Sequence, residues 1–223
     1  MTGVFVTGTG TEVGKTVVAA ALAQTLAREG RRVAVFKPAV TGLDEGEEAD
    51  HELLRRAAGS TQSDEEIAPY RYGPPASPHL AAAMAGEEIE PERLLEAARA
   101  AAAGADALVC EGVGGLLVPL SPGYPVRDLA ADLGYPLVIA ASPGLGTINH
   151  TLLTLESARA AGLEVAMVVL TPWPEDPTAI ELSNLETIAA LGQVEVQTLP
   201  PLNLAEPATW PALPVLTGRK PSI

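Results

Sequence analysis

The sequence predicts an α/β fold in which a mainly parallel sheet carries helices on both faces. Apolar runs of strand length alternate with longer segments of helix formers along the 223 residues. Hydrophobic residues make up 47% of the chain and aromatic residues only 4%, so small aliphatic side chains must fill the core, as they do between helices and a parallel sheet. A chain of this length can bury such a core, and we expect residues 1–223 to form one domain.

The first element is a strand, followed by a glycine-rich loop and a helix. Val4 to Val6 predict the strand, Val17 to Leu26 predict the helix, and the sequence GTGTEVGKT at residues 8–16 lies between them. In such a loop, successive backbone N–H groups converge on an anion, the lysine reaches the outer phosphates and the threonine hydroxyl binds Mg²⁺. We therefore expect Lys15 and Thr16 to hold a nucleoside triphosphate and its metal.

The spacing of the glycines departs from the usual phosphate loop. That loop would place a glycine at position 9, where this chain has threonine, so a strict pattern search fails. Gly14, Lys15 and Thr16 still match. The alternative is a helix start that happens to contain this tripeptide, and the position of the match between a strand and a helix disfavours it.

A second strand is expected at residues 32–36, and Lys37 and Pro38 follow it. Ligands of open parallel sheets gather at the carboxyl ends of the strands, so Lys37 should face the phosphates held by the first loop. Only three of the 14 basic residues are lysines, namely Lys15, Lys37 and Lys220. A compact ammonium suits phosphate or an acidic intermediate. The alternative is that coding bias favours arginine throughout this chain and that Lys37 is a lysine without functional reason.

Residues 39–90 are expected to be mostly loop, with one short helix at 51–58. Most side chains of the acidic run at 44–52 should simply face solvent. Asp50 stands at the start of the short helix and is the best candidate within the run for a carboxylate beside a Mg²⁺-nucleotide. The next helix, at 91–103, has an early proline and a glycine beyond its end.

A buried strand at 106–110 is expected to end at Glu111, before a glycine-rich segment at 112–115. The lone cysteine, Cys110, should fill space in this strand. Phosphate-loop enzymes hold Mg²⁺ or its waters with a carboxylate at the tip of an apolar strand, and glycines let the backbone approach the ligand. We therefore predict that Glu111 is a metal ligand, with an ordinary strand-end acid as the alternative.

The remaining elements continue the alternation of strand and helix. A glycine-preceded helix start at Gly146 and Thr147 can bind a carboxylate as well as a phosphate. His150, inside that helix, is expected to pack or cap. The expected order is a helix at 126–133, a strand at 137–141, a helix at 147–161, a strand at 164–170, a helix at 176–191, a strand at 197–199 and a proline-rich tail from Pro207 that wraps the surface.

Composition excludes several classes of function. The formal net charge of −14 argues against DNA or RNA as a partner, because such binding neutralises phosphates with Lys and Arg. No apolar run reaches membrane-spanning length, and the N-terminus has no charged leader before a cleavable apolar segment. We expect a cytoplasmic protein without a nucleic-acid or membrane partner.

Five sequence blocks, in the same order and spread over residues 5 to about 202, resemble dethiobiotin synthetase. The blocks are Phe5–Thr16, Phe36–Pro38 with Thr41-Gly42, Ser77-Pro78-His79, Glu111–Gly115 and Gly146–His150. The resemblance implies one ATP-binding synthetase domain of the phosphate-loop NTPase type over residues 1–223. It also implies that 7,8-diaminononanoate, CO₂ and ATP are converted with Mg²⁺ to dethiobiotin, ADP and phosphate.

The chemistry that the resemblance implies has three steps. One amine takes up CO₂ to give a carbamate, the carbamate attacks the γ-phosphate to give a carbamic-phosphoric anhydride, and the second amine closes the ureido ring and expels phosphate. Charge builds on the phosphoryl oxygens, where fixed cations and a metal stabilise it.

The resemblance also implies roles for individual residues. Lys15 and Lys37 would be catalytic, and Thr16, Asp50 and Glu111 would arrange Mg²⁺. Nucleotide contacts would come from Gly10, Thr11, Glu12, Val13, Gly14, Lys15, Thr16, Val17, Asp50, Glu111, Gly112, Val113, Gly114, Thr171, Pro172, Pro200, Pro201 and Leu202. Substrate contacts would come from Thr11, Lys37, Thr41, Gly114, Gly146, Thr147 and Asn149, where 146, 147 and 149 act across the interface of a homodimer.

Two positions depart from the family pattern. The family is expected to have an asparagine that reads the adenine where this chain has Thr171, so base contacts would rest on backbone groups near 171–172 and 200–202. Position 41 is threonine where serine is common, which keeps the hydroxyl.

Two other functions each share features with this sequence. A partitioning ATPase of the ParA/MinD type would carry a signature lysine five residues before the loop lysine, where this chain has Gly10, and would tend to have a basic surface. A related ligase such as a cobyrinate amidase-type synthetase would need a glutaminase domain with a nucleophilic cysteine, for which this chain has neither the length nor a suitable cysteine.

Overall fold

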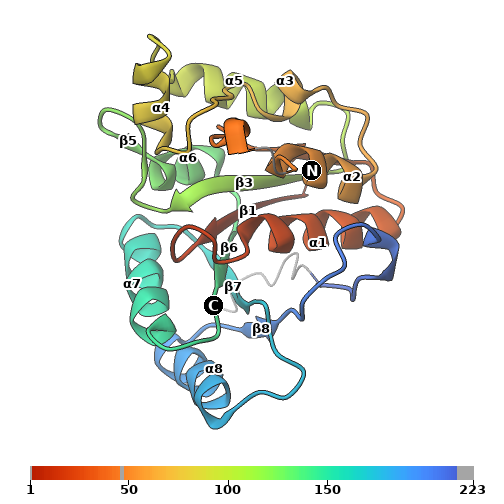
Figure 1. The fold of residues 1–223 in the computed structure, drawn as a ribbon, viewed down its shortest axis with the longest axis vertical. Helices are drawn as coiled ribbons and strands as arrows, with labels where there is room; N and C mark the ends of the chain where they lie inside the picture. The colour runs from red at the N-terminus through yellow and green to blue at the C-terminus, as the bar shows by residue number, and fades with distance from the viewer. Residues whose placement is uncertain (1, 46–47, 215–223) are drawn as a thin grey trace, which may run out of the picture.

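The computed structural model describes residues 2–45 and 48–214. Six strands form one sheet in the order β2-β3-β1-β6-β7-β8, and every pairing in it is parallel. Figure 1 shows β3, β1, β6, β7 and β8 following one another from top to bottom. The predicted α/β fold with a mainly parallel sheet is confirmed. The strands are β1 (Thr2–Gly8), β2 (Val33–Phe36), β3 (Ala107–Gly115), β6 (Leu137–Ala141), β7 (Val165–Leu170) and β8 (Val196–Thr198), with a separate antiparallel pair β4 (Pro119–Ser121) and β5 (Tyr124–Pro125).

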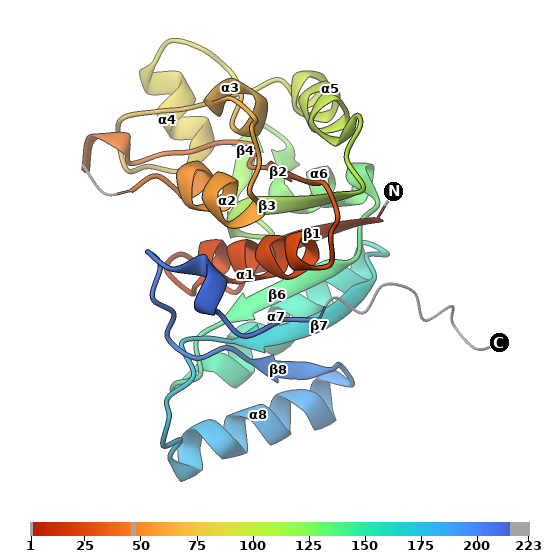
Figure 2. The same cartoon turned by 90° about the vertical axis from the view of Figure 1, so that its right-hand side faces the viewer.

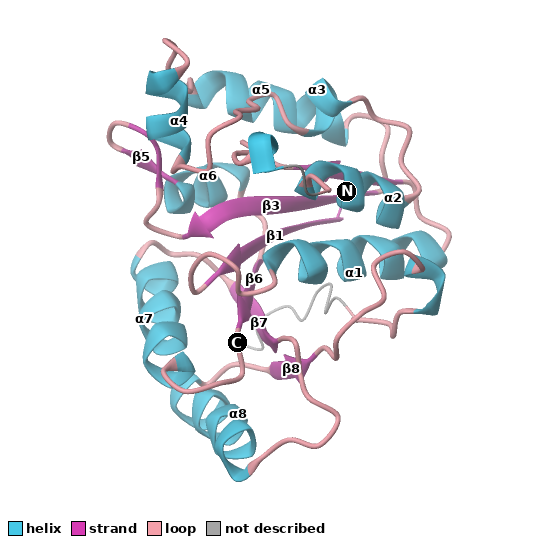
Figure 3. Cartoon of the chain, viewed as in Figure 1, coloured by secondary structure: helices cyan, strands magenta, loops and turns pink. Residues whose placement is uncertain are grey.

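Helices cover both faces of the sheet. Neighbouring residues of a strand point to opposite faces, so each face packs its own set of side chains against its helices. In β1, Val4 and Val6 pack with α1 and α2, whereas Phe5 packs with α4, α5 and α6. Figure 3 shows the strands in the middle of the molecule with the helices around them. The helices are α1 (Lys15–Arg28), α2 (Asp50–Ala58), α3 (Asp64–Ile67), α4 (Pro78–Met84), α5 (Pro91–Ala102), α6 (Val126–Leu133), α7 (Thr147–Ala160) and α8 (Ala179–Gly192), with 3-10 turns at Leu43–Glu45 and Pro207–Thr209.

Residues 39–90 are loop-rich, as expected, but the structure corrects the expectation of a single helix there. This segment also contains α3 and α4. Ser63 and Glu66 form a capping box at the start of α3, and Pro78 opens α4. Both helices are short, with four and seven residues, so neither shows the repeated apolar stripe that identifies a longer helix.

Two further boundaries differ from the sequence prediction. β3 does not end at Cys110 but continues to Gly115, because it pairs with β1 as far as Glu111 and again between Gly8 and Gly115 after an irregularity. The helix expected from residue 176 begins at Ala179, where Thr178 and Glu181 form a capping box. The β4–β5 pair was not expected at all.

The strand order fixes where the site lies. β1 is central, with β3 and β2 on one side and β6, β7 and β8 on the other. The chain therefore reverses its direction of winding beside β1, at the point where ligands bind in open parallel sheets. The loop after β1 opens at this crevice.

Part of the predicted surface tail is described. Trp210 and Leu213 are buried, each 2% exposed, in the core cluster that contains α1. The tail from Pro207 therefore wraps α1 as far as residue 214, and the rest of the predicted tail lies outside the described residues. Cys110 is buried, as expected. In the described part of the chain, no helix combines the length and the apolar character needed to cross a membrane.

An ion pair at the amino ends of β2 and β3 gives a prediction for acid stability. Arg32 donates to both carboxylate oxygens of Asp106, at 3.0 and 3.2 Å, and these bonds lower the pKa of Asp106 from 3.8 to about 2. Because the folded pKa lies below the unfolded one, the pair stabilises the fold above pH 3.8, and this contribution is lost as the pH falls towards 2. We expect Asp106→Asn to flatten the fall in the free energy of unfolding across that interval. Urea unfolding at several pH values measures both curves, and parallel curves would contradict the assignment.

Candidate active site

The loop after β1 wraps around the ammonium of Lys15. Gly14 precedes α1 with φ +86°, a left-handed conformation that glycine adopts readily, and its carbonyl accepts the first helical bond from the Val18 amide at 3.0 Å. Lys15 is only 7% exposed, and its Nζ donates to the carbonyl of Gly10 at 2.7 Å. The helix start and a cation are therefore presented to the same concave loop, which is the arrangement that binds phosphate.

The glycine at position 14 is also required by its neighbour. A Cβ added there would stand 2.5 Å from the methyl carbon of Thr171, which follows β7. We expect Gly14→Ala to lower the free energy of unfolding by about 1–3 kcal/mol and to weaken ATP binding, through backbone strain and this overlap.

A matched control separates the two causes. Gly30 has nearly the same φ, +80°, but a Cβ there would meet nothing within 4 Å, so Gly30→Ala carries only the backbone cost of about 1–2 kcal/mol. Adding Thr171→Ser to Gly14→Ala should restore part of the loss by removing the methyl. If both alanine variants lose the same free energy of unfolding and Thr171→Ser has no effect, the overlap contributes nothing. Urea unfolding and calorimetric titration with Mg-ATP provide the two measurements.

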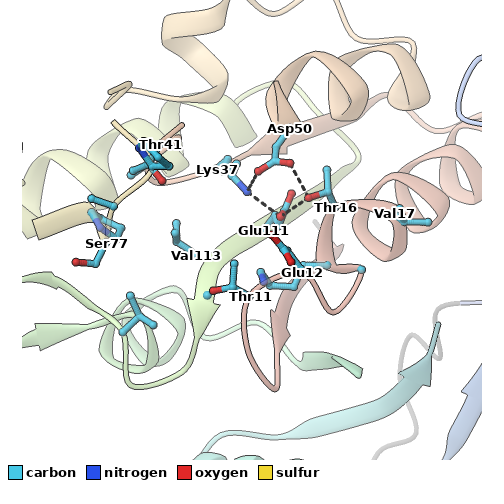
Figure 4. A pocket seen from close by; sticks show the side chains of 18 residues that line it. Thr11, Glu12, Thr16, Val17, Lys37, Thr41, Asp50, Ser77, Glu111 and Val113 are labelled. Carbon is cyan, nitrogen blue, oxygen red and sulfur yellow. Dashed lines mark hydrogen bonds and ion pairs between the residues drawn. The ribbon is translucent and has the colours of Figure 1, made fainter. Parts of the chain in front are cut away.

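Four side chains from four segments meet beside this loop. Lys37 Nζ lies 2.6 Å from Asp50 Oδ2 and 2.7 Å from Glu111 Oε1. The hydroxyl of Thr16 donates to Asp50 Oδ1 at 2.8 Å or to Glu111 Oε1 at 2.9 Å. Figure 4 shows these contacts as dashed lines. Thr16 comes from α1, Lys37 follows β2, Asp50 opens α2 and Glu111 belongs to β3. The structure brings together the residues that sequence reasoning had selected at separate strand and helix ends.

Electrostatics keep Lys37 charged. Burial alone would lower its pKa, but the charges of Glu111 and Asp50 and the hydrogen bonds to them raise the pKa above the usual value. Asp50 shows the same balance with the opposite sign: burial would raise its pKa, and the charge and hydrogen bond of Lys37, with the bond from Thr16, lower it. The pair is therefore an ammonium and a carboxylate near neutral pH.

Glu111 and Lys15 are shifted mainly by burial. Glu111 has no exposed surface, and its burial raises its pKa against the opposing charge of Lys37. Burial also lowers the pKa of Lys15, and the nearby Lys37 charge acts in the same direction while Glu111 opposes it. Both groups lose water on burial and would be stabilised by a ligand of opposite charge, a metal at Glu111 and a phosphate at Lys15.

A cavity of about 710 Å³ joins the two lysines. Six of its lining residues were not selected as site residues from the sequence: Ala39, Pro75, Ala76, Ser77, Pro78 and Val118. Five of the six carry no polar side chain, so they make part of the lining apolar. Ser77 and Pro78 belong to a tripeptide that supported the family resemblance, and that was the available signal. The remaining lining residues are Thr11, Glu12, Gly14, Lys15, Thr16, Val17, Lys37, Thr41, Asp50, Glu111, Val113 and Gly114.

Other candidate residues lie outside this lining. Gly146 and Asn149 are exposed and Thr147 is buried at the start of α7, so the expected second binding point is on the surface. Thr171 contacts the loop at Gly14, whereas Pro200 and Pro201 are exposed. Among the other expected nucleotide contacts, Pro172 follows Thr171, Gly10 is the acceptor for Lys15, Val13 and Leu202 pack against the core cluster of α1, and Gly112 packs against Phe5 and Val126.

The donor set suits Mg²⁺. Thr16, Asp50 and Glu111 offer only oxygen, the ligand type that this ion prefers, and the buried Glu111 Oε2 has no hydrogen-bond partner. Within residues 2–45 and 48–214, no three histidine, cysteine or acidic side chains form a complete cage. Mg²⁺ commonly binds through one or two carboxylates, waters and substrate phosphates, so this set fits an ion that arrives with a nucleotide.

Comparisons with known proteins show which sequences and structures this chain resembles. A family model described as an AAA domain matches residues 2–208. ATP-dependent dethiobiotin synthetase BioD of Anaeromyxobacter dehalogenans (strain 2CP-1) is 46% identical over 83% of this chain and 84% of its own length. The proteins of the same name from Rhodococcus erythropolis and Bacillus subtilis (strain 168) are 41% and 35% identical, over 88% and 90% of this chain and 87% of their own lengths.

A solved structure with the same fold is the signal recognition particle receptor FtsY from Elizabethkingia anophelis. It is 16% identical and covers 91% of this chain and 60% of its own, with a TM-score of 0.55. This likeness shows the fold alone.

Proposed function

The chain belongs to the ATP-dependent dethiobiotin synthetase family, and we propose that it forms dethiobiotin from 7,8-diaminononanoate, CO₂ and ATP. One observation carries the proposal: Lys15 and Lys37 line the same cavity as Thr16, Asp50 and Glu111. An ammonium beyond the phosphate loop is what a second anionic reactant needs, because it must be held against the γ-phosphate without repulsion. A carbamate is such a reactant.

The proposed reaction joins these two anions, the carbamate and the γ-phosphate of ATP. An amine of the substrate adds to CO₂ and loses a proton, which leaves a carbamate. A carbamate oxygen attacks the γ-phosphorus, and the bond from that phosphorus to ADP breaks. The second amine then attacks the carbamoyl carbon of the anhydride, closes the ring and expels phosphate as its proton leaves. In this scheme Lys37 holds the carbamate and stabilises the charge on the transferring phosphoryl group.

The other polar residues have complementary roles. When ATP binds, the Lys15 ammonium gives up its hydrogen bond to the Gly10 carbonyl and donates to β- and γ-phosphate oxygens instead. The phosphate oxygens are charged, so the new bonds are stronger. Thr16, Asp50 and Glu111 hold Mg²⁺, which neutralises charge on the phosphates when bound. Glu12 has a left-handed conformation, with φ 60°, and a turn of this kind can direct successive backbone amides towards the same anion.

The cavity also accounts for the diamine. Thr11, Thr41 and the backbone at Gly114 offer hydrogen-bonding groups in the cavity that the two lysines line, and apolar lining residues such as Ala76 and Val118 suit the carbon chain. We place the carboxylate of the substrate at the start of α7 in a second copy of the chain, at Gly146, Thr147 and Asn149. The base then lies near 171–172 and 200–202. These placements rest on the family resemblance.

The decisive experiment is incubation with diaminononanoate, labelled bicarbonate and Mg-ATP. A carbamate loses its label in acid, whereas the ureido carbonyl keeps it, so acid-stable label that requires both ATP and the diamine supports the proposal. Omission of each reactant in turn supplies the controls. Release of ADP at the same rate without the diamine, and no acid-stable label, would overturn it and favour a nucleotide switch.

A further inference from the structure

Residues 199–213, which we call the C-terminal strap, leave β8 and run along α1. Figure 2 shows this dark blue segment beside α1. The strap begins next to the end of β7: the amide of Leu199 donates to Leu170 at 3.0 Å, and Leu199 accepts from the amide of Trp173 at 2.8 Å. Thr171, between those two partners, has its methyl against Gly14 of the phosphate loop. The first residues of the strap are therefore one contact away from the loop.

The strap is anchored to the far end of α1. Arg28, in the last turn of that helix, donates to the carbonyls of Trp210, at 2.8 Å, and Ala208. The amide of Leu213 donates to the buried hydroxyl of Thr25 at 3.0 Å. The indole of Trp210 is 2% exposed, and its N–H donates to the carbonyl of Asn203 at 2.7 Å, which ties the anchored end of the strap to its beginning.

A second anchor comes from α2. Arg56, in the last turn of this helix, donates to the carbonyl of Leu204 at 2.9 Å and pairs with Glu48, just before the helix begins. The strap thus joins α1, which carries Lys15 and Thr16, to α2, which carries Asp50. These bonds tie the strap to both helices that contribute oxygen ligands for the metal.

The strand order indicates which part of a nucleotide lies near the strap. Lys37 and Glu111 come from β2 and β3, on one side of β1, and the γ-phosphate must lie there to meet the carbamate. Thr171 and Leu199 follow β7 and β8, on the opposite side of β1. The nucleoside of a triphosphate bound along the loop is then directed towards the beginning of the strap.

We propose that the C-terminal strap positions Mg-ATP, with Trp210 and Arg56 as positioning residues: Trp210 fixes the segment 199–204 beside the nucleoside, and Arg56 fixes the same segment to α2. This inference rests on the proposed nucleotide site. It assigns neither residue a contact with the reacting atoms. The strap should therefore change nucleotide affinity rather than the chemical step.

The test uses one variant at each positioning residue. Trp210→Phe keeps an aromatic ring but loses the N–H to Asn203. Arg56→Met keeps an unbranched apolar stem but loses the bond to Leu204 together with the pair to Glu48. We expect each to raise the Kd and the KM for Mg-ATP by about three- to tenfold, the range for one hydrogen bond, with kcat and the KM for the diamine unchanged. Arg32→Met, at the opposite edge of the sheet, should change none of these constants.

A matched core variant controls for stability. Ile89→Val loosens the core cluster on the opposite face of the sheet from α1 and the strap, and lowers the unfolding temperature without touching these bonds. If the strap variants resemble Ile89→Val, with a lower unfolding temperature and an unchanged Kd for Mg-ATP, the strap is merely structural and the proposal is overturned.

Hydrogen exchange supplies an independent readout, because coupling between two sites is reciprocal. Mg-ATP should slow exchange of the Leu213 amide in the unchanged protein and do so less in Arg56→Met; no slowing in the unchanged protein would contradict the proposal. Calorimetric Kd values need no turnover. If the unchanged protein makes no dethiobiotin, the proposed function is refuted. If both variants still bind Mg-ATP more weakly than that protein, the strap assignment stands.

Discussion

Lys37→Gln is expected to lower turnover by about 10²- to 10³-fold while leaving the Kd for Mg-ATP within a few-fold of the unchanged protein. The ammonium is buried, and its two carboxylate partners keep it charged and in place before any substrate arrives. A fixed charge of this kind stabilises the transition state without the cost of reorganising water. Lys15, not Lys37, holds the nucleotide in this account, so affinity and turnover should separate.

The glutamine at position 37 is a suitable probe because its amide can still donate to Asp50 or Glu111. Urea unfolding must show that the variant is folded, since the loss of the cation leaves two carboxylates close together. Arg32→Gln, which removes a cation from an exposed pair at the amino end of β2, the opposite end of that strand from Lys37, is the matched control and should keep full turnover. Near-normal turnover in Lys37→Gln removes Lys37 from the mechanism.

Glu111→Gln is expected to raise the Mg²⁺ concentration required for half-maximal activity by about ten- to 100-fold. Glu111 is fully buried, and its Oε2 has no protein hydrogen-bond partner, so its charge acts at short range and in a low dielectric. Asp50→Asn should act in the same direction but less strongly, because the Asp50 side chain is 42% exposed.

The measurement is initial rate against free Mg²⁺ at saturating ATP. Glu52→Gln provides the control, since it removes an exposed carboxylate two residues along α2 from Asp50. The assignment of a shared metal to Asp50 and Glu111 is wrong if both variants keep the Mg²⁺ dependence of the unchanged protein.

The parts of the molecule that local sequence determines could be predicted. The apolar run before residue 8, the glycine-rich loop and the helix after it lie next to one another in the chain, so their physical meaning is visible there. Lys37 and Glu111 were placed correctly near the loop by a general rule, because the carboxyl ends of parallel strands meet at one edge of the sheet. Their mutual contact at 2.7 Å follows from β2 and β3 being neighbours in the sheet.

The parts that the sequence concealed arise from contacts between distant segments. Ala39, Ala76 and Val118 have no distinguishing chemistry, and only folding brings them to one cavity. The extension of β3 past Glu111 depends on its pairing with β1, since glycine has little preference of its own for a strand. The tail was expected to wrap the surface, but the burial of Trp210 against α1 and its bond to Asn203 were not visible in a proline-rich sequence.

The central claim is that a carbamate oxygen attacks ATP beside Lys37 and later leaves with phosphate. The most direct test starts the reaction with C¹⁸O₂ and stops it before the label exchanges with water. If the claim holds, the released phosphate gains one ¹⁸O from CO₂ and the ureido carbonyl of the product retains the other. Phosphate that leaves with no oxygen from CO₂, while labelled dethiobiotin and ADP accumulate, would contradict it.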